Sequence, residues 1–226
     1  IELENNKLVE REGYYTLDTS LSNSVEIKDL SFKYYGSEEY IFESLNLNIP
    51  KSKHTVLTGP NGSGKSTLLG LVSKVFYPQE GSININTNEI GYVGVTPLIL
   101  NSTLRENFLY GNKSKIEDIN IEELMDEFEL FNSDEKTLDT IVSNKTLSSG
   151  QMQKIAFIRS LLANANLLLL DESTSNLDTK TKELIFNILL DKKITIINST
   201  HNYEDFHFDN HLRIIYEGDK RKIKSI

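Results

Sequence analysis

Apolar and polar residues alternate along two early segments of the chain, residues 25–34 and 45–49. This period of two residues is typical of strands with one face in the core and one in water. The pattern therefore predicts an antiparallel sheet at the start of the fold. Residues 54–59 carry no regular alternation and are expected to form a buried strand.

Strand and helix patterns follow one another along the rest of the chain. Strand patterns lie at 82–85, 89–93, 167–170, 194–198 and 213–216, and helical patterns at 68–76, 121–131, 149–163 and 179–190. This order predicts an α/β fold with a mainly parallel sheet. We expect an N-terminal antiparallel β subdomain and a helical lobe over about residues 97–163.

The first 24 residues are polar and weakly periodic, which is typical of a linker or a loosely docked arm. The folded domain is therefore expected over residues 25–226. The chain begins with Ile1 and shows no basic start followed by an apolar stretch. We interpret it as a piece of a longer protein.

Composition narrows the classes of function. The chain has 24 Lys and Arg against 33 Asp and Glu, a net charge of −9, which gives no overall field to attract nucleic acid. It has no cysteine, so disulfides, thiolate zinc sites and cysteine nucleophiles are excluded. No apolar run approaches the roughly 20 residues that cross a bilayer.

A glycine-rich segment between the strand at 54–59 and the following helix fits the pattern G-x-x-x-x-G-K-[ST]. Its residues are Gly59, Pro60, Asn61, Gly62, Ser63, Gly64, Lys65, Ser66 and Thr67. The glycines let backbone N–H groups turn toward phosphate oxygens, and the lysine supplies a positive charge. The serine hydroxyl suits Mg²⁺. The flanking strand and helix favour a P-loop NTPase core over a chance glycine-rich turn.

A second candidate site follows the apolar run at 167–170, where Asp171 and Glu172 stand side by side. Open α/β sheets bind ligands at the carboxyl ends of their strands. Asp171 would belong to the Mg²⁺ shell, and Glu172 would position the attacking water. Taken alone, the run equally fits a core strand followed by a helix cap. The phosphate loop favours the functional interpretation.

Between these two sites lies Leu147-Ser148-Ser149-Gly150-Gln151, and with it the sequence resembles the ATP-binding cassette (ABC) ATPases. Their L-S-G-G-Q signature precedes the acidic strand by about 20 residues, and here Leu147 precedes Asp171 by 171 − 147 = 24. The resemblance extends from about Val25 to His201. It implies that Ser148, Ser149, Gly150 and Gln151 contact the ATP held by a partner subunit.

The same resemblance assigns further roles. Phe32-Lys33-Tyr34 is similar to the family's aromatic loop, so Tyr34 would stack on adenine, with Tyr35 as the second choice and an ordinary strand tyrosine as the alternative. Residues 175–178 are similar to the loop that contacts the partner across the dimer. His201 is placed like the switch histidine. The implied catalytic residues are Lys65, Glu172 and His201, with Ser66 and Asp171 as metal ligands and ATP and Mg²⁺ as ligands.

Two short segments resemble the exporter-type cassettes. Residues 102–107 are similar to a T-x-R-E-N stretch, and residues 138–142 to an L-x-T-x-V run. The resemblance implies a membrane-spanning domain in the same full-length chain, a second cassette as partner, and a place at the cytoplasmic face of the membrane. No nucleic acid partner is expected.

Two positions depart from the family pattern. Val95 stands where a glutamine usually ligates Mg²⁺, and Ser149 replaces the first glycine of the signature. A degenerate cassette that binds ATP with little hydrolysis therefore stays open. A soluble ABC-type ATPase that acts on nucleic acid or on the ribosome is a second alternative that stays open. Only 147 − 65 = 82 positions separate Lys65 from Leu147, which leaves no room for a long coiled coil.

Overall fold

The computed structural model describes residues 14–112, 115–131, 137–175, 177–205 and 207–226. The chain divides into two compact units. The first unit consists of Ile1–Lys51, Gly59–Asn88 and Leu212–Ile226, and the second consists of Ser52–Thr58 and Glu89–His211. The chain therefore crosses between the units several times.

The sheet of the first unit has four strands in the order β1-β5-β2-β3. β2 (Asn23–Phe32) pairs antiparallel with β3 (Phe42–Pro50) and with β5 (Glu80–Ile85). The predicted antiparallel sheet is thus confirmed. β1 (Tyr15–Leu17) pairs parallel with β5 and lies within the segment expected to be an arm.

The first unit also contains a helix and a hairpin. α1 (Lys65–Val72) begins after Gly64 and buries most of its residues. β11 (Asn210–Glu217), which starts in the second unit, and β12 (Lys220–Ser225) form an antiparallel hairpin. β12 was not predicted, because its sequence is mostly basic and carries a single apolar residue.

The second unit is built on a parallel sheet in which β4 (His54–Thr58), β10 (Thr195–Ser199), β9 (Leu167–Asp171) and β6 (Ile90–Val93) are neighbours in that order. All three pairings are parallel. β4 and β10 are fully buried and β9 is buried over Leu167–Leu170, which explains the continuous apolar run of β9, whereas Tyr92 of β6 is exposed. The predicted parallel sheet is confirmed.

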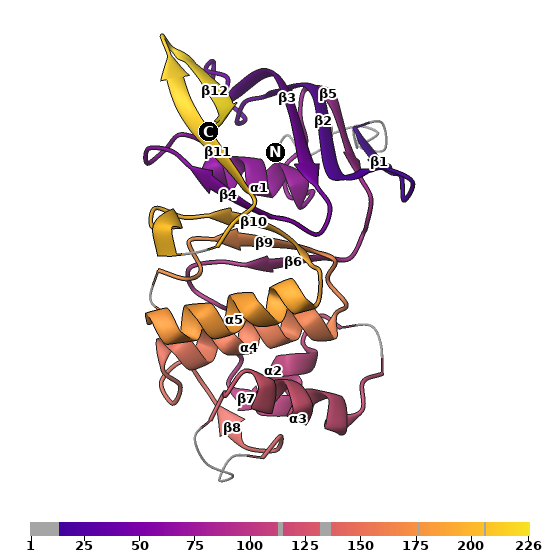
Figure 1. Cartoon of the computed structure of the whole chain (residues 1–226), viewed down its shortest axis with the longest axis vertical. Coiled ribbons are helices and arrows are strands. Elements are labelled where there is room, and N and C mark those ends of the chain that lie inside the picture. The colour runs from indigo at the N-terminus through magenta and orange to yellow at the C-terminus, as the bar shows by residue number, and fades with distance from the viewer. Residues whose placement is uncertain (1–13, 113–114, 132–136, 176, 206) are drawn as a thin grey trace, which may run out of the picture. The chain divides into compact units, whose positions relative to one another are not determined.

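Two helices, α4 (Ser149–Leu162) and α5 (Thr179–Asp191), lie on the same side of this sheet (Figure 1), and both contribute apolar residues to one core with β9 and β10. The sheet approaches α4 closely at Gly91 of β6. A Cβ there would lie 2.8 Å from Leu168 Cδ1 and 3.0 Å from Ser160 Cβ. α5 packs through Phe186, whose ring stacks on that of His54 with the centroids 4.8 Å apart.

The remainder of the second unit is a small lobe with its own apolar core. It contains β7 (Ser102–Thr103), α2 (Leu104–Leu109), α3 (Asp118–Glu127) and β8 (Ile141–Val142). β7 and β8 pair antiparallel, and they were not predicted because two-residue strands show no periodicity. Phe108, Phe128 and Phe157 are fully buried and join the lobe to α4.

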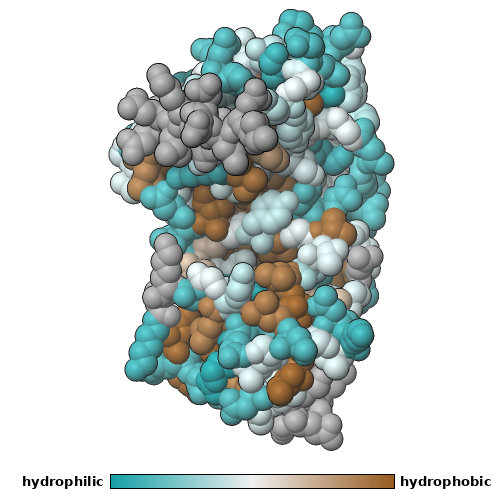
Figure 2. All heavy atoms as spheres, turned by 180° about the vertical axis from the view of Figure 1, so that it is seen from behind, coloured by the Kyte–Doolittle hydropathy of each residue, from teal (hydrophilic) through white to brown (hydrophobic). Residues whose placement is uncertain are grey.

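Apolar side chains at the surface stand in small groups separated by polar ones on the face shown in Figure 2. The exposed large apolar residues of the second unit include Val95, Leu98, Tyr110, Ile119 and Ile141. Within the described ranges, no helix has the length and apolar character required to cross a membrane.

We expect Phe157→Ala to lower the free energy of unfolding by about 3–5 kcal/mol, because it opens a cavity in a core that the lobe shares with α4. Urea denaturation followed by circular dichroism measures this loss. Ile141→Ala is the control, since Ile141 is 69% exposed and its truncation should change stability by less than about 0.5 kcal/mol. Equal losses in both variants would contradict the packing described here.

Burial lowers the pKa of His54 from its ordinary value of 6.5 to about 4, although a hydrogen bond with the His207 carbonyl opposes the shift. His54 is thus neutral in the folded chain at pH 7. Between pH 6.5 and about 4 the unfolded chain binds more protons, so we expect stability to fall as the pH falls through this window. Urea midpoints measured across this range give the dependence of stability on pH, which should become flatter in His54→Gln. An NMR titration in which the His54 imidazole titrates near pH 6.5 would contradict the lowered pKa.

Candidate nucleotide site

The phosphate loop runs from the end of β4 into α1, and two of its glycines are required by its geometry. Gly59 and Gly64 have φ values of 155° and 105°. A Cβ on Gly64 would lie 2.9 Å from Ile41 Cγ2, and one on Gly59 would lie 2.8 Å from Ser63 Oγ. The loop therefore adopts a backbone shape that only glycine permits at both positions.

Lys65 folds back over this loop. Its ammonium group donates hydrogen bonds to the carbonyl oxygens of Gly59 (3.0 Å) and Pro60 (3.2 Å), and the residue is only 6% exposed. Ser63 Oγ is buried without a hydrogen-bond partner in this same loop. A buried ammonium, an unpaired hydroxyl and the start of α1 form a donor set that fits phosphate oxygens.

Tyr34, the candidate for adenine stacking, is tied to the phosphate loop. Its Oη lies 2.7 Å from Thr67 Oγ1. Its ring meets those of Phe32 and Phe76 edge to face, with centroids 5.2 and 5.5 Å away. The ring is 41% exposed and so retains accessible surface, whereas Tyr35 is fully exposed and has no ring neighbour among the contacts described. The geometry favours Tyr34 over Tyr35.

The acidic pair stands at the end of β9: Asp171 is its last residue and Glu172 follows it. Glu172 has a φ of 50°, and its backbone N–H donates to Ser199 O at 2.9 Å, which connects the turn to β10. Its Oε1 lies 3.2 Å from His201 Nε2, and both side chains are partly exposed. Two residues that are 29 positions apart in the sequence thus meet at the ends of neighbouring strands.

Asp171 contacts a residue that the sequence did not single out. The Tyr92 hydroxyl donates a hydrogen bond of 2.9 Å to Asp171 Oδ2. Burial and the nearby carboxylate raise the pKa of Tyr92, so its phenol stays protonated at neutral pH and remains a donor. The sequence pattern around Tyr92 does not indicate this contact, because the contact depends on the parallel pairing of β6 with β9.

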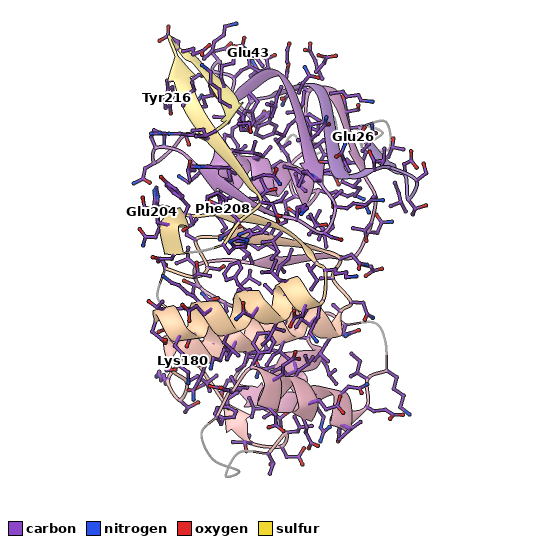
Figure 3. All side chains as sticks on the ribbon, viewed as in Figure 1. Glu26, Glu43, Lys180, Glu204, Phe208 and Tyr216 are labelled. Carbon is purple, nitrogen blue, oxygen red and sulfur yellow. The ribbon has the colours of Figure 1, made fainter. Side chains whose placement is uncertain are left out.

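The segment after His201 forms η2 (Tyr203–Asp205), which includes Glu204, and then passes Phe208 (Figure 3). Tyr203 packs against His211 with the ring centroids 4.6 Å apart. His211 Nε2 lies 2.8 Å from Thr58 Oγ1, at the end of β4. The segment after His201 is therefore anchored to the strand that leads into the phosphate loop.

The signature residues start α4. Ser148 is the N-cap: its Oγ accepts from the Gln151 N–H (3.2 Å), and Gln151 Oε1 accepts from the Ser148 N–H (2.9 Å). Ser149 is exposed and Gly150 is half-buried. In the segment at 175–178, Asn176 lies outside the described residues, while Asp178 caps α5.

The turn after β6 carries Val95, the residue that stands where the family pattern has a glutamine. Val95 is 46% exposed and has no polar side-chain atom. Gln153 of α4 holds this turn by donating to the carbonyl oxygens of Val95 (2.9 Å) and Gly94 (3.3 Å). Sequence reasoning missed Gln153, because nothing in its spacing distinguishes it from an ordinary helix residue.

Ser66 carries a hydroxyl oxygen and Asp171 a carboxylate, and oxygen donors of these kinds are the ones that Mg²⁺ prefers. Across the part of the chain described, no group of three or more His, Asp or Glu side chains forms a metal site of its own. Nucleotide-bound Mg²⁺ needs only one or two protein ligands besides phosphate and water, so the chemistry of either side chain by itself fits this ion. The phosphate loop belongs to the first unit, and Asp171 and Glu172 belong to the second.

A glycine-rich loop between strand and helix, with carboxylates at the end of a parallel strand, defines a phosphate-loop nucleotide-binding protein of the α/β class. The ABC transporter family matches residues 42–175, more than half of the chain. The chain therefore belongs to the ABC transporter family and is an ATP-binding cassette, a domain that hydrolyses ATP.

The relatives are transport proteins. The chain is 32% identical to the ATP-dependent lipid A-core flippase of Vibrio parahaemolyticus, over 92% of this chain and 39% of the flippase. It is 32% identical to the mitochondrial ATP-binding cassette sub-family B member 10 of Mus musculus, over 77% of this chain and 27% of that protein. The chain thus spans well under half the length of these relatives.

A solved structure shares the fold. The structure of a bacterial Atm1-family ABC exporter with ATP bound superimposes with a TM-score of 0.77 and 24% sequence identity, over 88% of this chain and 38% of that one. The α/β architecture expected from the sequence is confirmed.

We expect Gly64→Ala to weaken ATP binding at least tenfold, because the added methyl would contact Ile41 in a backbone conformation that alanine disfavours. Equilibrium binding of a fluorescent ATP analogue measures the loss. Gly111→Ala is the matched control: Gly111 also has a positive φ, 79°, but a Cβ there meets nothing within 4 Å. It should cost about 1 kcal/mol of stability and leave ATP binding unchanged; unchanged binding in Gly64→Ala would contradict the required loop geometry.

Proposed function

We propose that this chain is the ATP-hydrolysing motor of an ABC exporter, driven by nucleotide-dependent pairing of two cassettes. The observation that carries the proposal is the contact between Glu172 and His201, 3.2 Å apart at the ends of adjacent parallel strands. Membership of the ABC family and similarity to the flippase support it.

The chemistry assigned to each residue follows from its type and position. Glu172 acts as the base that positions the attacking water, and its partly exposed carboxylate is accessible to that water. His201 holds the Glu172 carboxylate and contacts the γ-phosphate. Lys65 neutralises charge on the β- and γ-phosphates, since its ammonium has only neutral carbonyls as partners described here.

Nucleotide binding uses residues of the first unit. Tyr34 stacks on adenine, and the backbone and side chains from Gly59 to Thr67 surround the phosphates. Ser66 and Asp171 hold Mg²⁺, which when bound neutralises phosphate charge and organises the oxygens of the nucleotide. The exposed Ser66 hydroxyl is free to turn toward an ion.

A second cassette completes each site. Ser148, Ser149, Gly150 and Gln151 begin a helix of 14 residues whose N-terminus offers a positive dipole to the γ-phosphate of the partner's ATP. Hydrolysis removes that phosphate contact and releases the pair, which makes nucleotide state a mechanical switch.

The rest of the exporter lies outside this chain in our proposal. A membrane-spanning domain of the same full-length protein precedes the cassette, and the cassette works at the cytoplasmic face of the membrane; the cassette begins before residue 25, because β1 and the start of β2 belong to its first sheet. The lobe at about 97–163 transmits the nucleotide state. The relatives' greater length and their names, a flippase and a permease among them, support this arrangement over a nucleic-acid or ribosome ATPase.

We expect Glu172→Gln to lower the rate of Mg²⁺-dependent ATP hydrolysis at least 100-fold while ATP binding persists, because the amide cannot act as a base. The wild-type rate should rise faster than linearly with protein concentration, as a composite site requires. Light scattering should show that the variant accumulates as an ATP-bound pair.

The matched control is Glu122→Gln, which changes an exposed acid on α3 in the same way and should leave the rate unchanged. A wild-type chain that binds ATP but hydrolyses none at any concentration would contradict the proposal and favour the degenerate cassette.

A further inference from the structure

The proposed hydrolysis of ATP does not account for the hydrogen bond between Tyr92 and Asp171. β6 pairs with β9 in parallel register, with Tyr92 opposite Leu169. Side chains two residues apart on a strand point to the same face, so Tyr92 shares a face with both Leu169 and Asp171. This register brings the phenol to the carboxylate at 2.9 Å.

Val95, in the neighbouring turn, has no side-chain donor or metal ligand. Its carbonyl oxygen accepts from Gln153 Nε2 at 2.9 Å, and Gln153 is only 2% exposed. The carbonyl of Gly94 accepts from the same amide. The backbone of the turn is thus engaged with α4, and Tyr92 is the residue of β6 whose polar group reaches the acidic site.

A single hydrogen bond to one carboxylate oxygen has a defined consequence. The phenol occupies one lone-pair direction of Asp171 Oδ2 and leaves Oδ1 available. It fixes the rotation of the carboxylate without adding charge, so it does not repel a cation. Tyr92 is 48% exposed as a residue, so it lies at the surface of the second unit and is not part of its core.

We propose that Tyr92 is a positioning residue that holds Asp171 in the orientation in which it binds the divalent cation of the nucleotide. The inference rests on the proposed function, since that function makes Asp171 a metal ligand. Loss of the Tyr92 hydroxyl lets the Asp171 carboxylate rotate and weakens binding of the cation. Binding of the nucleotide in the absence of the cation stays the same.

The experiment uses Tyr92→Phe in the full chain, combined with Glu172→Gln so that ATP is bound and not consumed. Binding of a fluorescent ATP analogue is titrated with Mg²⁺, and separately measured in excess EDTA. We expect the Mg²⁺ concentration for half-maximal enhancement to rise about fivefold, which is the effect of about 1 kcal/mol for a lost hydrogen bond. Binding in EDTA should be unchanged.

Tyr110→Phe in the same background is the matched control. Tyr110 is also half-exposed and also belongs to the second unit. Its ring faces the Arg159 guanidinium, and it is distant in sequence from Asp171 and Glu172. Its Mg²⁺ titration should equal that of the parent. Electron paramagnetic resonance of Mn²⁺ with ATP gives a second readout, in which the Tyr92 variant should bind fewer ions at a given concentration.

Three possible results distinguish failure of the inference about Tyr92 from failure of the proposed function. An unchanged Mg²⁺ titration in Tyr92→Phe, with Asp171→Asn strongly weakened, would overturn the inference and leave the proposed function intact. A tighter titration would also overturn it, because the phenol would then compete with the ion. If Asp171→Asn titrates like its parent, the assignment of Asp171 as a metal ligand fails, and the proposed function fails in that part.

Discussion

The parallel register of β6, β9 and β10 is the constraint on which the acidic site depends. Pairing of Leu170 with Asn198 places Asp171 opposite Ser199, and the Glu172 N–H then bonds to the Ser199 carbonyl. That bond holds Glu172 at a positive φ, which a residue with a side chain adopts at a cost of about 1–2 kcal/mol. The result is a glutamate whose carboxylate meets His201 and is not directed into the sheet.

The phosphate loop depends on a different constraint, close approach of backbone to side chains. Ile41 and Phe42 of the first unit lie so near Gly64 that no Cβ fits. The same packing lets Lys65 turn its ammonium over the loop, where only neutral carbonyls surround it. A buried cation with such weak partners is an unfavourable arrangement by itself. Phosphate is the anion that relieves it.

The sequence predicted both chemical centres for sound physical reasons. A phosphate loop is continuous in the chain, so its glycines, lysine and serine appear together with their flanking strand and helix. The parallel strands were visible as apolar runs, because strands buried on both faces need no polar alternation. Short pieces were missed: β7 and β8 have two residues each, and β12 is stabilised by partners such as Glu39, which bonds Arg221 at 2.7 Å.

The fold class and the family could both be recognised from the sequence, because they depend on contiguous patterns, and the same patterns predict the residue types expected to bind phosphate. Only the tertiary structure decided which distant residues meet: Tyr92 with Asp171, Gln153 with the turn at Val95, and His211 between Tyr203 and Thr58. The contacts of Tyr92, of Gln153 and of His211 with Thr58 join segments that are far apart in the chain. Their formation depends on strand register and helix packing, which a pattern of single residues does not encode.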